Sequence, residues 1–307
     1  MLLAFGLAWL VHLPALVGGA TPEDPIYGIS AFLYMFTPGI AALVVAYFVW
    51  RPRSVPRATG LIPLRPVRRV GGYSLVALLI LPVIGFIAPL LAGAFGVIRL
   101  DLTGFSGFRE ALAEQAPPVV GYLPESGFPL AALLMGLGFI VVTIFPFTLL
   151  TCFGEELGWR GYLLPRLLPL GVWPALLVSG LVHGLWHSPQ LFIQFRSGFM
   201  GVTGALVFLA FCLVIGVLLG WLRLASGSVW PAVIAHAANN SFVIMGFLVL
   251  SHADSPTHSL LYSGGAGGVI GMALIAAFLL PPALSGRIRV RSFEPSLEEG
   301  QERPPSR

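Results

Sequence analysis

The sequence predicts an all-α integral membrane protein, a polytopic bundle of about eight transmembrane helices. Hydrophobic residues make up 57% of the 307-residue chain, charged residues only 10%, and the mean hydropathy is +0.90. Soluble domains carry about 25% charged residues, so this chain has too little charge to cover a water-facing surface. Because lipid offers the backbone no hydrogen bonds, long apolar runs must cross a bilayer as helices. The composition therefore excludes a water-soluble or disordered protein.

Eight apolar runs approach or exceed the roughly 20 residues that cross a bilayer as a helix. They lie at about 1–19, 29–50, 71–97, 130–153, 171–187, 201–223, 230–251 and 264–283. The first run lacks the basic N-terminal region that is typical of a signal peptide, so we interpret it as a retained span. The fifth run is short and ends at Ser188-Pro189.

The arginines predict how the bundle is oriented. The chain has 17 basic side chains, all arginine, against 13 acidic ones, and its net charge of +4 is too small to indicate nucleic-acid binding. Basic residues are retained on the cytoplasmic side of a membrane. The Arg-rich loop 51–70 follows the second run and contains no acidic residue. We therefore expect a multi-pass protein of the cell membrane with both termini in the cytoplasm, and only Arg196 falls on the opposite side.

The same pattern predicts how the chain is divided. We expect about three N-terminal spans in 1–129, a core domain in 130–251, a last transmembrane helix in 252–291 and a disordered polar tail in 292–307. The two cysteines, Cys152 and Cys212, lie in apolar runs without CxxC spacing. They indicate neither a disulfide framework nor a thiolate metal site.

Charged groups inside a span are costly and usually mark function. Glu155 and Glu156 directly follow an apolar run within a continuing helical pattern. On a helix Glu156 and Arg160 are four residues apart and can form an ion pair. Glu155 points about 100° away from Glu156, so it is free to face another partner. A pair of interfacial acids beside a solvated arginine would be the simpler explanation.

Three histidines lie in the later spans. His183 and His187 share one helical face, a spacing that suits two ligands of one metal ion. His236 and Asn240 have the same spacing and can present an imidazole and a carboxamide to one point. Alternatively, each group bonds to a neighbouring helix. Straight vertical helices would place His187 and His236 near opposite membrane faces, so either the 154–187 segment tilts or partly re-enters, or the span boundaries predicted there are wrong.

These residues form three short motifs. Glu155-Glu156 with Arg160 fits EExxxR, His187 fits the histidine of FxxxH, and His236 with Asn240 fits HxxxN. In this order on successive apolar segments, the motifs resemble those of the CPBP intramembrane proteases. That family includes type II CAAX prenyl endopeptidases and bacteriocin-processing or self-immunity proteins. The resemblance covers roughly residues 130–250, and His183 stands at the aromatic position of the second motif.

The resemblance implies an intramembrane endopeptidase that hydrolyses a peptide bond of a membrane-anchored, hydrophobic or lipidated substrate. It implies that Glu155 is the catalytic base, that His187 holds or polarises the water, and that His236 with Asn240 forms the oxyanion site. Glu156 and Arg160 would be a supporting pair. A carboxylate near an imidazole can act as a general base for water, and the developing oxyanion needs donors already in place. The expected partners are this substrate and the lipid bilayer, with no nucleic acid.

Metal use stays open on the sequence alone. His183, His187 and His236 could supply three nitrogens to zinc and leave a position for water. Equally, Glu155 could activate water without a metal, and the chain contains no HExxH motif. Two other functions fit the same residues: a membrane immunity or interaction protein with a vestigial site, and an ion- or proton-coupled transporter. The transporter is less favoured because no pair of matched broken spans occurs in two repeated halves.

Overall fold

The structure, a computed structural model, describes residues 1–255 apart from 63, 97 and 116–129. The described residues form helices and no strand, with one isolated bridge between Leu100 and Ser251. This confirms the predicted all-α class. The expected eighth span at 264–283 and the polar tail from 292 lie outside the described residues.

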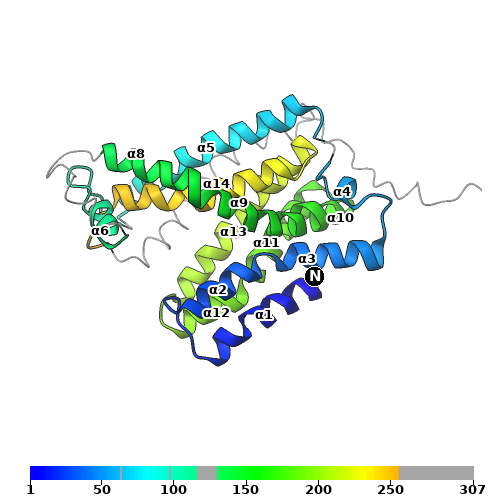
Figure 1. Ribbon diagram of the computed structural model, residues 1–307, viewed down its shortest axis with the longest axis horizontal. Helices are drawn as coiled ribbons and strands as arrows, with labels where there is room; N and C mark the ends of the chain where they lie inside the picture. Colours follow the sequence, from blue (N-terminus) through cyan, green and yellow to red (C-terminus); the bar gives the residue numbers. More distant parts are fainter. Residues whose placement is uncertain (63, 97, 116–129, 256–307) are drawn as a thin grey trace, which may run out of the picture.

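The first helices belong to two apolar segments that lie side by side (Figure 1). They are α1 (Leu2–Val17), α2 (Pro25–Tyr34), α3 (Thr37–Val45) and the π-helical η1 (Ala46–Trp50). Helices α2, α3 and η1 form one apolar segment that is interrupted at Met35 and Phe36. Pro38 follows this interruption in the first turn of α3, where its missing N–H cannot continue the hydrogen bonding of α2.

Two helices, α5 (Val67–Ala94) and α6 (Ser106–Gln115), precede a long helical run. That run consists of α8 (Leu130–Phe139), η2 (Ile140–Ile144), α9 (Phe145–Glu156), η3 (Leu157–Leu163), α10 (Leu164–Leu167) and η4 (Leu168–Leu170). The helical structure therefore continues well beyond residue 153, where the apolar run of the sequence ends. Its π-helical stretch η3 begins directly after Glu156, and such stretches are frequent at functional sites.

A turn at Gly171, with φ +99°, ends this run and starts the last four described helices. They are α11 (Val172–Trp186), α12 (Ser188–Arg196), α13 (Val202–Ser226) and α14 (Trp230–Leu250). Helix α14 lies at the centre, because 75% of its apolar window is buried against 39% for each of the other long spans. It packs against α5, α9 and α13. The largest hydrophobic cluster lies along these contacts and includes Leu81, Leu219 and Phe242.

A short helix within the Arg-rich loop, α4 (Val55–Ala58), leads into a segment that docks on one end of the bundle. The Val229 N–H and the Ser228 hydroxyl donate to the Gly60 carbonyl at 3.0 and 3.2 Å. Gly60 has φ +76° and packs directly against the guanidinium group of Arg223. A side chain at Gly60 would therefore meet both backbone strain and the buried arginine.

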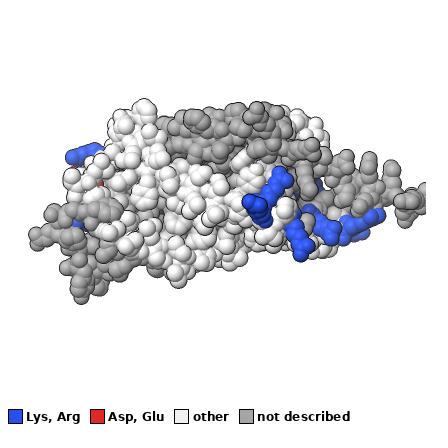
Figure 2. All heavy atoms as spheres, turned by 90° about the horizontal axis from the view of Figure 1, so that it is seen from above, with Lys and Arg blue, Asp and Glu red and all other residues white. Residues whose placement is uncertain are grey.

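Charge is distributed as expected for a bundle that crosses a membrane. Among the described residues, four helical segments are long and apolar enough to span it: Pro25–Trp50, Val67–Ala94, Val202–Ser226 and Trp230–Leu250. Basic side chains gather at the ends of the molecule, and little charge appears between them on the face seen in Figure 2. Arg196 lies at the end opposite the Arg-rich loop and donates to the carbonyl oxygens of Leu16 and Ala20 at 2.8 and 3.0 Å. These contacts at the C-terminal end of α1 give this exceptional arginine a structural partner.

Candidate active site

Glu155 near the end of α9 bonds His183 on α11. The distance between Glu155 Oε2 and His183 Nε2 is 2.9 Å, and the two residues are 1% and 2% exposed. A carboxylate oxygen only accepts, so His183 donates its Nε2–H. The other ring nitrogen of His183, Nδ1, is buried without a partner among the described residues.

Glu156, the next residue, faces a different pair of groups. Its Oε1 atom accepts a hydrogen bond from Arg160 Nη1 at 2.7 Å and another from His236 Nδ1 at 2.9 Å. Glu156 and Arg160 are completely buried and His236 is 5% exposed. One oxygen therefore joins the arginine of η3 to the histidine of α14.

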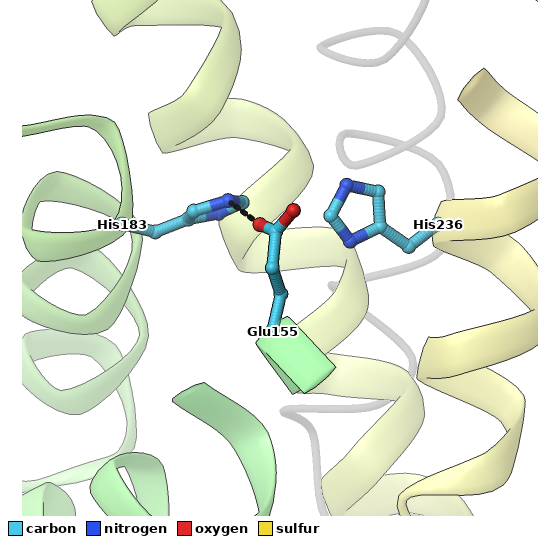
Figure 3. A group of neighbouring side chains, drawn as sticks. All are labelled: Glu155, His183 and His236. Atoms are coloured by element: carbon cyan, nitrogen blue, oxygen red, sulfur yellow. Dashed lines mark hydrogen bonds and ion pairs between the residues drawn. The ribbon is translucent and has the colours of Figure 1, made fainter. Parts of the chain in front are cut away.

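Three helices bring these groups together. Figure 3 shows the carboxylate of Glu155 between the imidazoles of His183 and His236, which project from α11 and α14. The two imidazole centroids are 5.6 Å apart. The sequence places His187 and His236 far apart in depth, and the structure removes this difficulty because His183, one turn before His187, is the histidine beside Glu155.

His187 lies at the edge of this cluster, at the end of α11. Its ring centroid is 5.4 Å from that of His183, and the side chain is half-buried. Nδ1 of His187 is 2.6 Å from the hydroxyl of Tyr34 and 3.2 Å from Oε1 of Gln190. His187 thus lies beside His183, and no hydrogen bond joins it to Glu155 or His236 among the described residues.

Asn240 lies one turn beyond His236 on α14. Its amide nitrogen is 3.6 Å from the sulfur of Cys152, which is on α9 one turn before Glu155. Asn240 also accepts a hydrogen bond from the side chain of Asn239 at 3.0 Å. The predicted His236–Asn240 pair therefore lies along the contact between α14 and the helix that carries the glutamates.

The group suited to hold a metal differs in one member from the predicted trio of histidines. Ligand atoms of Glu155, His183 and His236 all lie within 4.8 Å of one another, and His187 is not part of this group. Zinc ligands lie at 2.0–2.1 Å, so tetrahedral donors are separated by about 3.3 Å. The direct contact of 2.9 Å between Glu155 and His183 would have to open slightly. Pairs that lie up to 4.8 Å apart would have to move closer, and with both changes the donor types fit zinc.

Close backbone contacts fix the glutamate helix against the interruption between α2 and α3. A β-carbon at Gly154 would lie 2.8 Å from the Met35 carbonyl oxygen, and one at Gly39 would lie 2.6 Å from the Gly154 carbonyl oxygen. Gly158 is in equally tight contact with Pro38. Glycines next to the two glutamates therefore allow an N-terminal span to form one wall of the site.

Several buried polar atoms around the site have no partner among the described residues. They are Glu156 Oε2, Arg160 Nε and Nη2, His183 Nδ1 and Ser179 Oγ. Buried polar groups without protein partners are typically bonded to ordered water. The surroundings of Arg160 and His183 thus suit bound water, the reactant of a hydrolase.

Sequence reasoning did not identify Tyr34 and Gln190, the hydrogen-bond partners of His187. Tyr34 is one residue of an apolar run more than a hundred positions earlier, and its sequence context gives no signal. Gln190 is three residues after His187 at helical spacing, which could have marked it as a neighbour.

Comparison with known families agrees with this geometry. Residues 128–242 match the family model described as "Type II CAAX prenyl endopeptidase Rce1-like". The match contains all seven residues of the predicted site and confirms the resemblance over this segment. It indicates a membrane protease. A search of the curated proteins found no match.

Proposed function

We propose that this protein is an intramembrane endopeptidase in which Glu155 activates water for attack on a peptide bond. The observation that carries the proposal is the position of the Glu155 carboxylate between His183 and His236 in a buried site. Burial excludes bulk water, and this strengthens the electrostatic interactions between the few polar groups present.

Each residue has a defined part in the proposed reaction. Glu155 takes a proton from water as the water oxygen bonds to the substrate carbonyl carbon, and the carbonyl oxygen becomes an oxyanion. His236 and Asn240 donate hydrogen bonds to that oxyanion. Glu155 then returns the proton to the leaving nitrogen as the C–N bond breaks. The products are a carboxylic acid and an amine.

Glu156 supports this arrangement by holding His236. Because His236 Nδ1 donates to Glu156, the ring is oriented with Nε2 at its far edge. With Nδ1 bonded to Glu156, a proton on Nε2 would make this ring a donor to the oxyanion. Arg160 in turn fixes Glu156 through the ion pair of 2.7 Å.

A metal would change the part that Glu155 plays. In the group that fits zinc, Glu155 is a ligand, and a carboxylate bound to the metal is no longer available as the base. Zinc would then supply the activated water, while His183 and His236 would hold the metal. We favour Glu155 as the base because it directly contacts the donor His183 at 2.9 Å.

The substrate class follows from the location of the site. A hydrolytic centre within a bundle of apolar helices meets peptides that enter from the membrane. We propose a membrane-anchored or hydrophobic peptide, with or without a prenyl group, that is cut near the cytoplasmic face marked by the Arg-rich loop.

Purified protein tests this function on a farnesylated peptide and on the same peptide without the lipid. The Glu155→Gln variant should lose activity by roughly a thousandfold, as expected on removal of a general base. Glu110→Gln is the matched control, because Glu110 is exposed on α6 outside the site. Equal cleavage by the parent and Glu155→Gln would refute the proposal, and so would the absence of cleavage by the parent on every peptide offered.

A further inference from the structure

His187 begins a chain of hydrogen bonds that leads away from the site between α2 and α12. The Tyr34 hydroxyl lies 2.6 Å from His187 Nδ1 and donates to Gln190 Oε1 at 2.6 Å. Further along α12, Gln194 donates to the Tyr27 hydroxyl at 2.7 Å. Side chains of one face of α12 thus meet two tyrosines of α2 across the helix contact.

The direction of these bonds determines where the proton of His187 lies. A tyrosine hydroxyl has one proton, and Tyr34 gives it to Gln190 Oε1, an atom that can only accept. Tyr34 can therefore only accept at its contact with His187 Nδ1. Gln190 Oε1 itself lies 3.2 Å from the same nitrogen and also requires a donor. The Tyr34 hydroxyl oxygen and Gln190 Oε1 can therefore only accept from Nδ1, so Nδ1 carries the proton.

We propose that Gln190 is a positioning residue that holds His187 in its Nδ1–H tautomer, with Nε2 unprotonated, both directly and by fixing the hydroxyl of Tyr34. The Gln190 oxygen is decisive because it fixes the direction of the bond through Tyr34. Without that acceptor the Tyr34 hydroxyl could turn and donate to Nδ1, which would move the imidazole proton to Nε2. The proposal brings α2, which lies outside the segment matched by the family model, into the machinery of the site.

Packing makes Tyr34 suitable for this task. Its side chain is only 2% exposed, and its ring stacks on Trp186 with the centroids 4.3 Å apart. His12 on α1 contacts the ring edge-on at 4.7 Å. The ring therefore has little freedom to move, and the hydroxyl stays within reach of His187 and Gln190.

The consequence for chemistry rests on the proposed function. An imidazole with Nδ1–H and a bare Nε2 accepts a hydrogen bond from water at Nε2, whereas the other tautomer would donate there. Donation from Nδ1 to a fixed acceptor also makes Nε2 more basic. His187 can then hold the attacking water by its proton and present the oxygen lone pair toward the substrate.

The tautomer can be measured without any substrate. Protein labelled with ¹⁵N-histidine gives two-bond ¹⁵N–¹H correlations that distinguish protonated from unprotonated ring nitrogens, and a His187→Asn sample assigns the His187 signals. We expect the Nδ1–H form in the parent. An Nε2–H form or a doubly protonated ring would overturn the proposal.

Two variants then separate the effect of Gln190 from that of Tyr34. Gln190→Met should shift His187 toward Nε2–H and lower kcat roughly tenfold at unchanged KM. Tyr34→Phe should keep Nδ1–H, because Gln190 Oε1 still accepts directly. An unchanged tautomer in Gln190→Met, or Nε2–H in Tyr34→Phe, would overturn it.

The matched control is Tyr47→Phe, since Tyr47 belongs to the same span but is 60% exposed. It should change neither the spectrum nor the rate. If Gln190→Met does not fold, the spectra of the parent and Tyr34→Phe still decide. An Nδ1–H tautomer in a protein that cleaves no peptide would refute the proposed function and leave this inference intact.

Discussion

The two adjacent glutamates have opposite surroundings. Glu156 shares one oxygen between Arg160 and His236, so proton transfer at that oxygen would break both contacts. Glu155 contacts the single histidine His183 at 2.9 Å and lies between two imidazoles. Helix geometry separates the two side chains by about 100°, which sends them to different neighbours. The difference indicates that one carboxylate holds the site together while the other is available for chemistry.

The largest expected effect comes from replacing each glutamate by glutamine. Both variants should lose roughly a thousandfold in activity, since one lacks the base and the other leaves His236 without its anionic partner. Only Glu156→Gln should also lower stability, by about 3–5 kcal/mol, because it leaves the buried charge of Arg160 unpaired. Unfolding in detergent measures this difference. Equal stability of the two variants would remove the distinction between them.

A double variant sharpens the same comparison. Arg160→Met leaves Glu156 buried and uncompensated and should cost about 3–5 kcal/mol of unfolding free energy. Adding Glu156→Gln removes the second charge, so the double variant should lose much less than the sum of the single variants. Additive losses would show that the two side chains act independently. Thermal unfolding of all four proteins supplies the cycle.

Replacing His183 by phenylalanine tests the other half of the site. His183→Phe places the phenylalanine of the FxxxH motif at this position but removes the donor to Glu155. We expect kcat to fall roughly tenfold to a hundredfold, as for other lost supporting contacts, while the fold is retained. Full activity of His183→Phe would mean that Glu155 is positioned without this histidine.

Metal removal distinguishes the two possible roles of Glu155, general base and metal ligand. If Glu155 is the base, prolonged treatment with a chelator should leave peptide cleavage unchanged within about twofold. Metal analysis of the purified protein should then show no stoichiometric zinc. Loss of activity on chelation, restored by added zinc, would assign Glu155, His183 and His236 as ligands instead.

A carboxylate outside the membrane should give the smallest effect. Hydrogen bonds from the Ser106 hydroxyl, the Ser106 N–H and the Gly104 N–H hold the pKa of Asp101 well below its usual range. The ionised form therefore stabilises the fold above the unfolded pKa of about 3.9, and this contribution is lost as the pH falls through the lower folded pKa. Asp101→Asn should lower the melting temperature slightly at neutral pH and not in acid. A difference that persists or grows in acid would contradict this explanation.

Much of the fold could be predicted because composition alone distinguishes a membrane protein from a water-soluble one. The apolar runs mark the helices, and glutamates and histidines in such runs stand out as costly exceptions. Their pairing was harder to predict. His183 and His187 share a face of α11. Which of the two histidines contacts Glu155 depends on the position of α11 along α13. A β-carbon at Gly216 would lie 2.5 Å from Gly180 Cα, so this position is set by a contact between two glycines.

The contribution of the N-terminal spans could not be predicted for a different reason. Tyr34, the last residue of α2, reaches His187 because the chain is interrupted after it, and this interruption and Pro38 of α3 pack against Gly154 and Gly158. Such contacts between distant segments depend on tertiary packing, and neither hydrophobic periodicity nor a local motif records them.

The glycine contacts also restrict how a substrate can enter. The backbones of α3 and the glutamate helix are in direct contact where Gly39 faces Gly154 and where Pro38 faces Gly158, which leaves no space for a peptide between them at these points. For the membrane-bound peptide proposed as the substrate, we therefore expect entry between other helices. Cross-linking α3 to α9 should therefore leave peptide cleavage unchanged. A pair of helices whose cross-linking blocks cleavage would identify the entry path.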